Sequence, residues 1–322
     1  MRAESTEVAV AAEAEERRAV VSALRRGVDE AGRFGGEIEA AVMFEGWEAP
    51  LVVGTKAAAG DRWMRMWSMS KVVVAVALLR SKGWGEEAGE ALSPEAEEAL
   101  RAALTRSENC PQRRVVLELQ HSLESSTEKA RREIARTVEE AGGRARPGAE
   151  VAPPDPSCVE LLESQTEIPD PLAPALLLGT SEWRVADAVR FMHALGSGAY
   201  GHVLSERILN LMREPKERSR EILPEEFTAA VDWGAGRALR VLDPAYKAGW
   251  GGTQQGAFMA GQMAVVELPS GERAALAVMF HPAVQPGQDD PGLTPAPQAL
   301  EAVMEPLARR LRGAGQQPGL PR

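Results

Sequence analysis

The sequence has few cysteines, few lysines and no long hydrophobic run. Two cysteines in 322 residues, Cys110 and Cys158, exclude a disulfide-based scaffold and lie at no metal-ligand spacing. They leave two alternatives open: one disulfide in an oxidising compartment, or two buried thiols. The longest unbroken apolar run, residues 72–79, is far shorter than the ~20 residues that cross a membrane, so no membrane span is predicted.

A basic surface is also lacking. The formal net charge of −10 argues against general affinity for nucleic acid or anionic membrane, because both need a positive face. The first residues are acidic and precede no apolar segment, so no secretory signal is predicted within this sequence. The location and the oligomeric state of the protein are left open.

Signals for metals and cofactors are weak. None of the four histidines lies at ligand spacing from a cysteine or an aspartate, so no metal site is predicted. Residues 196–201 match the glycine pattern of dinucleotide-binding loops, but they follow a predicted helix and not a strand. We interpret them as a helix-terminating turn. No cofactor is predicted.

Periodicity and turn residues predict strands near both ends of the chain and helices between them. The predicted strands are 37–44, 50–54, 245–251, 257–268 and 274–281. The predicted helices are 11–33, 86–103, 113–123, 127–142, 180–195 and 296–311, and 147–174 is predicted as a long irregular loop. This order indicates an α+β fold, in which both ends of the chain complete an antiparallel sheet of about five strands around a helical insertion. The sheet subdomain is predicted at 1–67 plus 213–322 and the helical subdomain at 68–212, with a cleft between them.

The most informative local pattern is Ser68-x-x-Lys71 at the start of the apolar run. One helical turn places the two side chains on the same face. A buried lysine is desolvated, which favours its uncharged form and lets it act as a base toward the serine. The chain has only six lysines, and its other Ser-x-x-Lys match, Ser126 to Lys129, lies in a charged segment that predicts a solvated helix surface.

Two further patterns follow in order, Ser107-Glu108-Asn109 and Lys247-Ala248-Gly249. Together with Ser68-x-x-Lys71, they resemble the three motifs of the penicillin-recognising serine enzymes, the class A β-lactamases and D-alanyl-D-alanine peptidases. The predicted layout of strands and helices also resembles that fold. Each pattern alone has a simpler explanation: a helix start with a solvated lysine, a helix cap, and a surface lysine on a strand.

The resemblance implies a catalytic role for three residues. Ser68 would be the acylated nucleophile and Lys71 its general base. Ser107 would relay a proton to the leaving nitrogen. The substrate would be a small molecule or a peptide with an amide or ester bond.

The resemblance also implies a set of binding residues. Asn109 would hold Lys71 or a substrate amide, and Lys247 would support Ser107 and attract a substrate carboxylate. Gly249 would permit close approach of the strand. The backbone N–H groups of Ser68 and Trp250 would form the oxyanion hole. Trp250 could equally be a core residue.

Departures from the family pattern shape the expected activity. Ala248 replaces the usual hydroxyl residue, and Trp250 adds bulk. The loop at 147–174 has no Glu-x-x-Leu-Asn sequence, and the nearest candidates for a deacylating carboxylate are Glu163 and Glu167, which could simply be solvated. Slow deacylation is therefore predicted, which favours a peptidase-like, esterase-like or penicillin-binding role over a true β-lactamase. The alternative is a non-catalytic binding or sensor module that retains the fold.

Overall fold

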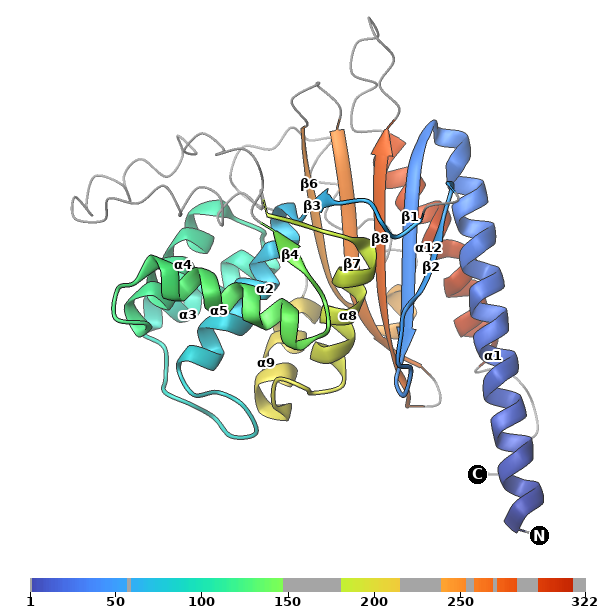
Figure 1. The fold of residues 1–322 in the computed structure, drawn as a ribbon, viewed down its shortest axis with the longest axis horizontal. Coiled ribbons are helices and arrows are strands. Elements are labelled where there is room, and N and C mark those ends of the chain that lie inside the picture. The colour runs from blue at the N-terminus through green and yellow to red at the C-terminus, as the bar shows by residue number, and fades with distance from the viewer. Residues whose placement is uncertain are drawn as a thin grey trace, which may run out of the picture.

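A computed structural model describes most of the chain. The described residues are 2–56, 59–146, 181–214, 239–252, 258–268, 271–282 and 295–314. They form an antiparallel sheet with helices on both faces, which confirms the predicted α+β fold (Figure 1). The predicted loop at 147–174 lies outside the described residues.

The main sheet has five strands in the order β2-β1-β8-β7-β6, with every neighbouring pair antiparallel. The strands are β1 (Gly36–Phe44), β2 (Leu51–Gly54), β6 (Ala245–Gly252), β7 (Phe258–Glu267) and β8 (Arg273–Pro282). Because β1 pairs with β8 along its whole length, the two ends of the chain share one sheet. β6 is an edge strand, so part of its backbone points away from the sheet.

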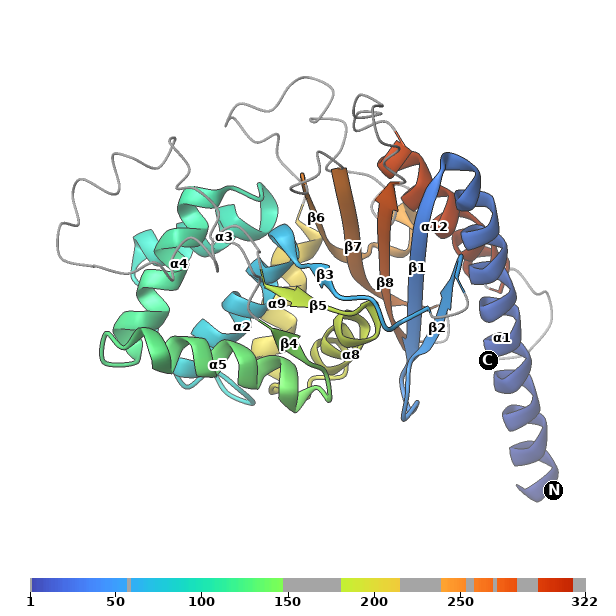
Figure 2. The same ribbon diagram turned by 45° about the horizontal axis from the view of Figure 1, so that its top comes forward.

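The two faces of the sheet bury separate cores. On β1, alternate side chains point to opposite faces: Ile38 and Val42 face α1 (Arg2–Ala31) and α12 (Pro295–Ala314), whereas Ala41 faces the other helices. Figure 2 shows α1 and α12 on one side of the sheet and the remaining helices on the other. Both faces of β1 are thus covered, and its buried part is apolar throughout, apart from Glu39.

The helical part is arranged around α2 (Ser70–Ser81). Four helices pack around it: α3 (Pro94–Thr105), α4 (Asn109–Ser122), α5 (Thr127–Glu140) and α9 (His202–Arg213). This explains why α2 is buried along most of its length, since a helix covered on all sides is apolar on all sides. α8 (Val185–Gly196) packs directly against β1, β7 and β8.

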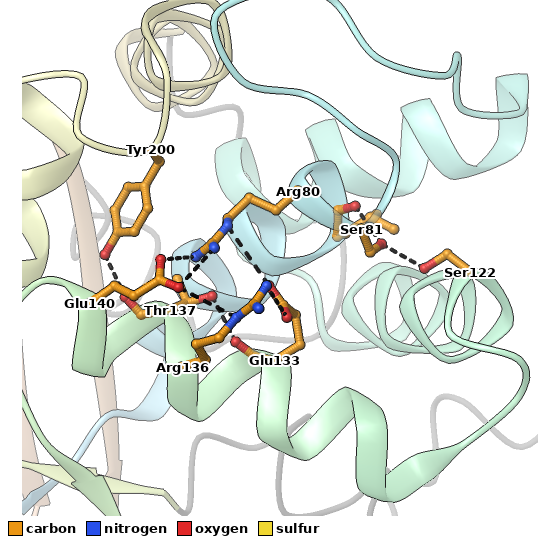
Figure 3. A network of polar contacts seen from close by, with 9 residues as sticks. Arg80, Ser81, Ser122, Glu133, Arg136, Thr137, Glu140 and Tyr200 are labelled. Atoms are coloured by element: carbon orange, nitrogen blue, oxygen red, sulfur yellow. Dashed lines mark hydrogen bonds and ion pairs between the residues drawn. The ribbon is translucent and has the colours of Figure 1, made fainter.

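A polar network fixes the C-terminal end of α2 (Figure 3). The Arg80 guanidinium donates to Glu140 at 3.0 Å and lies over the ring of Tyr200, with 5.7 Å between Cζ and the ring centroid. Tyr200 Oη in turn donates to the backbone carbonyl of Thr137 at 2.5 Å. The helix that carries Lys71 at one end is therefore held to α5 at the other.

Four predicted helix starts were wrong. The helix predicted from residue 11 begins at Arg2, and the one predicted from residue 113 begins at Asn109. The helix predicted from residue 86 begins at Pro94, after Ser93, whose side chain accepts a hydrogen bond from the Ala96 N–H; Ser and Pro at these two positions favour a helix start. The helix predicted from residue 180 begins at Val185, because Glu182–Trp183 forms strand β5. β5 pairs with β3 (Met64–Arg65) and β4 (Ala145–Arg146), a long-range pairing that local periodicity does not reveal.

Candidate active site

Ser68 lies in a short 3-10 helix, η2 (Trp67–Met69), that continues into α2. Ser68 and Lys71 are three residues apart, a spacing that puts both side chains on the same side of a helical turn. Trp67 adopts a left-handed φ of 45°, which is uncommon outside glycine and is typical of strained functional segments. Ser68 is half-buried.

Lys71 is completely buried at the start of α2. Its Nζ donates to Asn109 Oδ1 at 2.9 Å and to the backbone carbonyl of Ser107. Both of these acceptors are neutral, so neither bond requires the amine to be charged. The side chain of Asn109 therefore lies against Lys71.

Lys247 approaches the same loop from the sheet. It is 3% exposed, and its Nζ lies 2.6 Å from Ser107 Oγ and 3.2 Å from the carbonyl of Ala248. The two lysines thus hold opposite ends of one residue: Lys71 holds the Ser107 backbone and Lys247 its hydroxyl.

Ser107 is in a left-handed conformation, with φ of 62°. It follows Arg106, the C-cap of α3, and occupies the position where helices commonly end with a left-handed glycine. α4 begins two residues later with Asn109. The tight junction between α3 and α4 therefore aims both the hydroxyl of Ser107 and the amide of Asn109 at the lysines.

Gly249 brings β6 into contact with η2. A Cβ atom at this position would lie 2.8 Å from the Met66 carbonyl oxygen and 3.0 Å from Ser68 N, closer than real Cβ atoms approach backbone. Gly261 pairs with Gly249 across β6 and β7, and a Cβ there would lie 2.8 Å from Met69 Cε. Sequence reasoning missed Gly261; the signal was a glycine inside a predicted strand, which indicates close approach.

The backbone of Ser68 and the strand that carries Trp250 are consequently adjacent. Ser68 N belongs to the first turn of a helix, where N–H groups have no partner inside the helix. Trp250 follows Gly249 on the edge strand and pairs with Ala260. The assignment of these two N–H groups to an oxyanion hole stays a prediction.

Glu163 and Glu167 fall outside the described residues. In the part that the structure describes, no cluster of histidine, cysteine, aspartate and glutamate side chains could hold a metal ion. Within the same residues, no helix has the length and apolar character needed to cross a membrane.

Cys110 is disulfide-bonded, and Cys158, the other cysteine of the chain, lies outside the described residues.

Comparison with known proteins identifies the fold. No protein-family model and no curated protein sequence matches the chain. The transpeptidase domain of the FtsI4 D,D-transpeptidase from Legionella pneumophila is 13% identical, with a TM-score of 0.54 over 90% of this chain and 94% of that chain. A class A β-lactamase from Bacteroides cellulosilyticus is 12% identical, with a TM-score of 0.56 over 89% and 98%. PBP-A, in an acyl-enzyme complex with penicillin G, is 15% identical, with a TM-score of 0.54 over 91% and 97%. The chain therefore has the α+β fold of the class A β-lactamases and the D,D-transpeptidases, at low sequence identity.

Proposed function

We propose that this protein is a serine hydrolase that forms an acyl-enzyme on Ser68 with an amide or ester substrate. The observation that carries the proposal is that Lys71, three residues after Ser68, and Lys247 both bond to Ser107. A purely structural chain has no evident need to bury two lysines beside one serine, because burying amines is costly. The fold shared with β-lactamases and transpeptidases supports the same chemistry.

In the proposed acylation step, Lys71 takes the proton of Ser68 Oγ as the oxygen attacks the substrate carbonyl. A bond forms between Oγ and the carbonyl carbon, and the oxyanion is held by the N–H groups of Ser68 and Trp250. The bond to the leaving nitrogen or oxygen then breaks. Ser107 passes its hydroxyl proton to the leaving group and takes a proton from Lys247, whose Nζ donates to its Oγ. The contact between Ser68 Oγ and Lys71 Nζ would close on substrate binding, as catalytic hydrogen bonds often do.

Deacylation requires water and a base. Neither Glu163 nor Glu167 is among the described residues, and the sequence has no Glu-x-x-Leu-Asn in the loop that carries them. We therefore expect the acyl-enzyme to be long-lived. A D-alanyl-D-alanine peptidase-like, esterase-like or penicillin-binding activity fits this expectation better than rapid β-lactam hydrolysis.

Ala248 favours a second candidate, a binding or sensor module that is acylated once or not at all. In the resembling enzymes the position after the lysine carries a hydroxyl that helps to bind the acid group of the substrate. Alanine cannot donate that hydrogen bond. Substrate binding would then be weaker while the fold is kept.

One experiment separates the candidates. Purified protein is incubated with a fluorescent penicillin and with a chromogenic ester, and intact mass and product release are followed for wild type, Ser68→Ala and Lys71→Met. Turnover of either compound that is lost in Ser68→Ala supports the serine hydrolase, whereas an adduct that forms once and is not turned over supports the sensor. If wild type neither forms an adduct nor hydrolyses either compound, the proposed acyl-enzyme is wrong.

The second Ser-x-x-Lys sequence supplies matched controls. Ser126 caps α5, and Lys129 is half-exposed and paired with Glu124. Ser126→Ala and Lys129→Met change the same residue types at the same spacing on the surface. They should leave adduct formation at the wild-type level, although Ser126→Ala should cost about 1 kcal/mol of stability through loss of the helix cap.

A further inference from the structure

Ser107 needs support to keep its conformation. A left-handed φ costs a serine roughly 1–2 kcal/mol, and such backbone strain persists only where the surroundings impose it. The conformation matters because it directs the Ser107 carbonyl at Lys71 and the hydroxyl at Lys247. Those two bonds restrain the carbonyl and the hydroxyl of Ser107, and the side chains of its two neighbours, Arg106 and Glu108, supply further restraints.

The two residues that flank Ser107 are bonded to each other. Arg106 Nε donates to Glu108 Oε1 at 2.8 Å, and Arg106 Nη2 donates to Glu98 Oε1, also at 2.8 Å. An ion pair between residues i and i+2 closes a small ring around the residue between them. The bond to Glu98, which lies on α3, ties this ring to the preceding helix.

The ion pair between Arg106 and Glu108 is shielded enough from solvent to help hold the conformation of the loop. The side chains of Arg106 and Glu108 are 22% and 13% exposed. The bonds to Glu98 and then to Glu108 raise the pKa of Arg106, while partial burial acts in the opposite direction. Shielded, doubly bonded guanidinium groups hold geometry better than isolated surface ion pairs, which contribute little.

We infer that Glu98, Arg106 and Glu108 form a clamp that holds Ser107 in the conformation that joins Lys71 to Lys247. Arg106 and Glu108 are then positioning residues for the acylation of Ser68, and this inference rests on the proposed function. Sequence reasoning treated Glu108 only as the middle of the Ser-x-Asn pattern, and nothing in the local sequence indicated its bond to Arg106.

The clamp predicts a specific kinetic signature. Removing one charge, in Glu108→Gln or Arg106→Gln, should lower the acylation rate constant 10-fold or more, because about 1 Å of displacement in a catalytic group can cost roughly 100-fold. The dissociation constant for the acyl donor should change less than about 3-fold, since the clamp does not touch the substrate. The double variant should be no slower than the slower single variant, because both changes break the same bond.

The test measures the acylation rate constant and the dissociation constant, together with amide hydrogen exchange, which needs no activity. Amide hydrogen exchange of residues 105–110 is compared in wild type, Glu108→Gln, Arg106→Gln and Arg101→Gln, with melting curves to show that each is folded. Arg101 is the matched control, because it lies on the same helix but pairs with Glu214, away from Ser107. Faster exchange at 106–109 in both clamp variants, with Arg101→Gln unchanged, is the expected result.

Two results would overturn the clamp: unchanged exchange at 106–109 in both clamp variants, or the same loss of acylation in Arg101→Gln. Failure of the proposed function looks different. In that case wild type forms no adduct with a penicillin or an activated ester, and the exchange comparison alone decides whether the clamp holds Ser107. Arg106→Lys, which keeps the charge but not the two-pronged geometry, should restore part of the exchange protection.

Discussion

Lys247 Nζ and Ser107 Oγ lie 2.6 Å apart although the two residues are 140 positions apart in the chain. This contact joins the edge strand of the sheet to the junction between α3 and α4. It brings a second lysine to the residue whose carbonyl Lys71 also contacts, so disturbing it should affect chemistry more than folding.

Replacing Lys247 with methionine tests that contact. The change keeps most of the buried volume but removes the amine that holds the Ser107 hydroxyl, so the acylation rate constant should fall by roughly 100-fold, the size of effect expected for a misplaced catalytic group. Stopped-flow or gel-based labelling with a fluorescent penicillin measures the rate. Lys129→Met is the control and should react at the wild-type rate. Equal rates for Lys247→Met and wild type would contradict the assignment.

Ser107→Gly and Ser107→Ala separate the strain of the loop from its chemistry. Both variants lose the hydroxyl, so both should acylate at least about 100-fold more slowly. Glycine adopts the left-handed conformation without strain, whereas alanine keeps the cost of roughly 1–2 kcal/mol. Glycine also makes the unfolded chain more flexible, which offsets part of this gain. Ser107→Gly should therefore be more stable than Ser107→Ala by up to about 1 kcal/mol in urea unfolding. The reverse order of stability would argue against a strained Ser107.

Gly249→Ala tests the contact between β6 and η2. The added methyl group would meet backbone atoms of Met66 and Ser68, which cannot rotate away. We expect a loss of about 1–3 kcal/mol in the free energy of unfolding, typical of overpacking, and slower acylation of Ser68. Gly85→Ala is the control, since a Cβ there would meet nothing within 4 Å. A Gly249→Ala protein with wild-type stability and reactivity would show that the two backbones are not in contact.

Reduction tests the contribution of the disulfide at Cys110, which directly follows Asn109. A reducing agent should lower the free energy of unfolding by about 2–4 kcal/mol, as loss of a disulfide commonly does. Urea unfolding with and without the reductant, together with a thiol count, measures the effect. Cys110→Ser should show the reduced stability and no further response to reductant. An equal response in both proteins would mean that the disulfide is not the cause.

His281 should make stability depend on pH. Burial, reinforced by Arg62 and opposed by Glu37, lowers the pKa of His281 from 6.5 to about 3. Below pH 6.5 the unfolded chain binds a proton at this residue that the folded chain does not bind until about pH 3. The contribution of His281 is therefore present above pH 6.5 and is lost as the pH falls, by at most about 1.4 kcal/mol per pH unit.

The difference between wild type and His281→Gln isolates this effect. Unfolding free energies of the two proteins are measured at pH 7, 6, 5 and 4. The value for wild type should fall toward that of His281→Gln as the pH falls, because only wild type has the titrating side chain at this position. His121→Gln, on an exposed part of α4, is the control and should run parallel to wild type. Parallel curves for His281→Gln would contradict the lowered pKa.

Much of the fold could be predicted because local chemistry encodes it. The apolar run of α2, the strands β7 and β8 with the turn between them, and the exposed helix of Lys129 all follow from periodicity and turn residues. The start of α8 could not be predicted in this way, because Glu182–Trp183 becomes a strand only by pairing with β3 and β4. A two-residue strand has no period to detect.

The sequence alone determined which residues could do chemistry: a serine one turn before a lysine, and a second lysine next to a glycine. Only the tertiary structure decided that these residues meet. Pairing of β1 with β8, packing of η2 on Gly249, and the left-handed turn at Ser107 are contacts between distant segments, and their energies depend on neighbours that the local sequence does not name. For that reason the spacing of Ser68 and Lys71 could be deduced from one stretch of chain, whereas the bonds from Lys247 to Ser107 and from Arg106 to Glu108 could not.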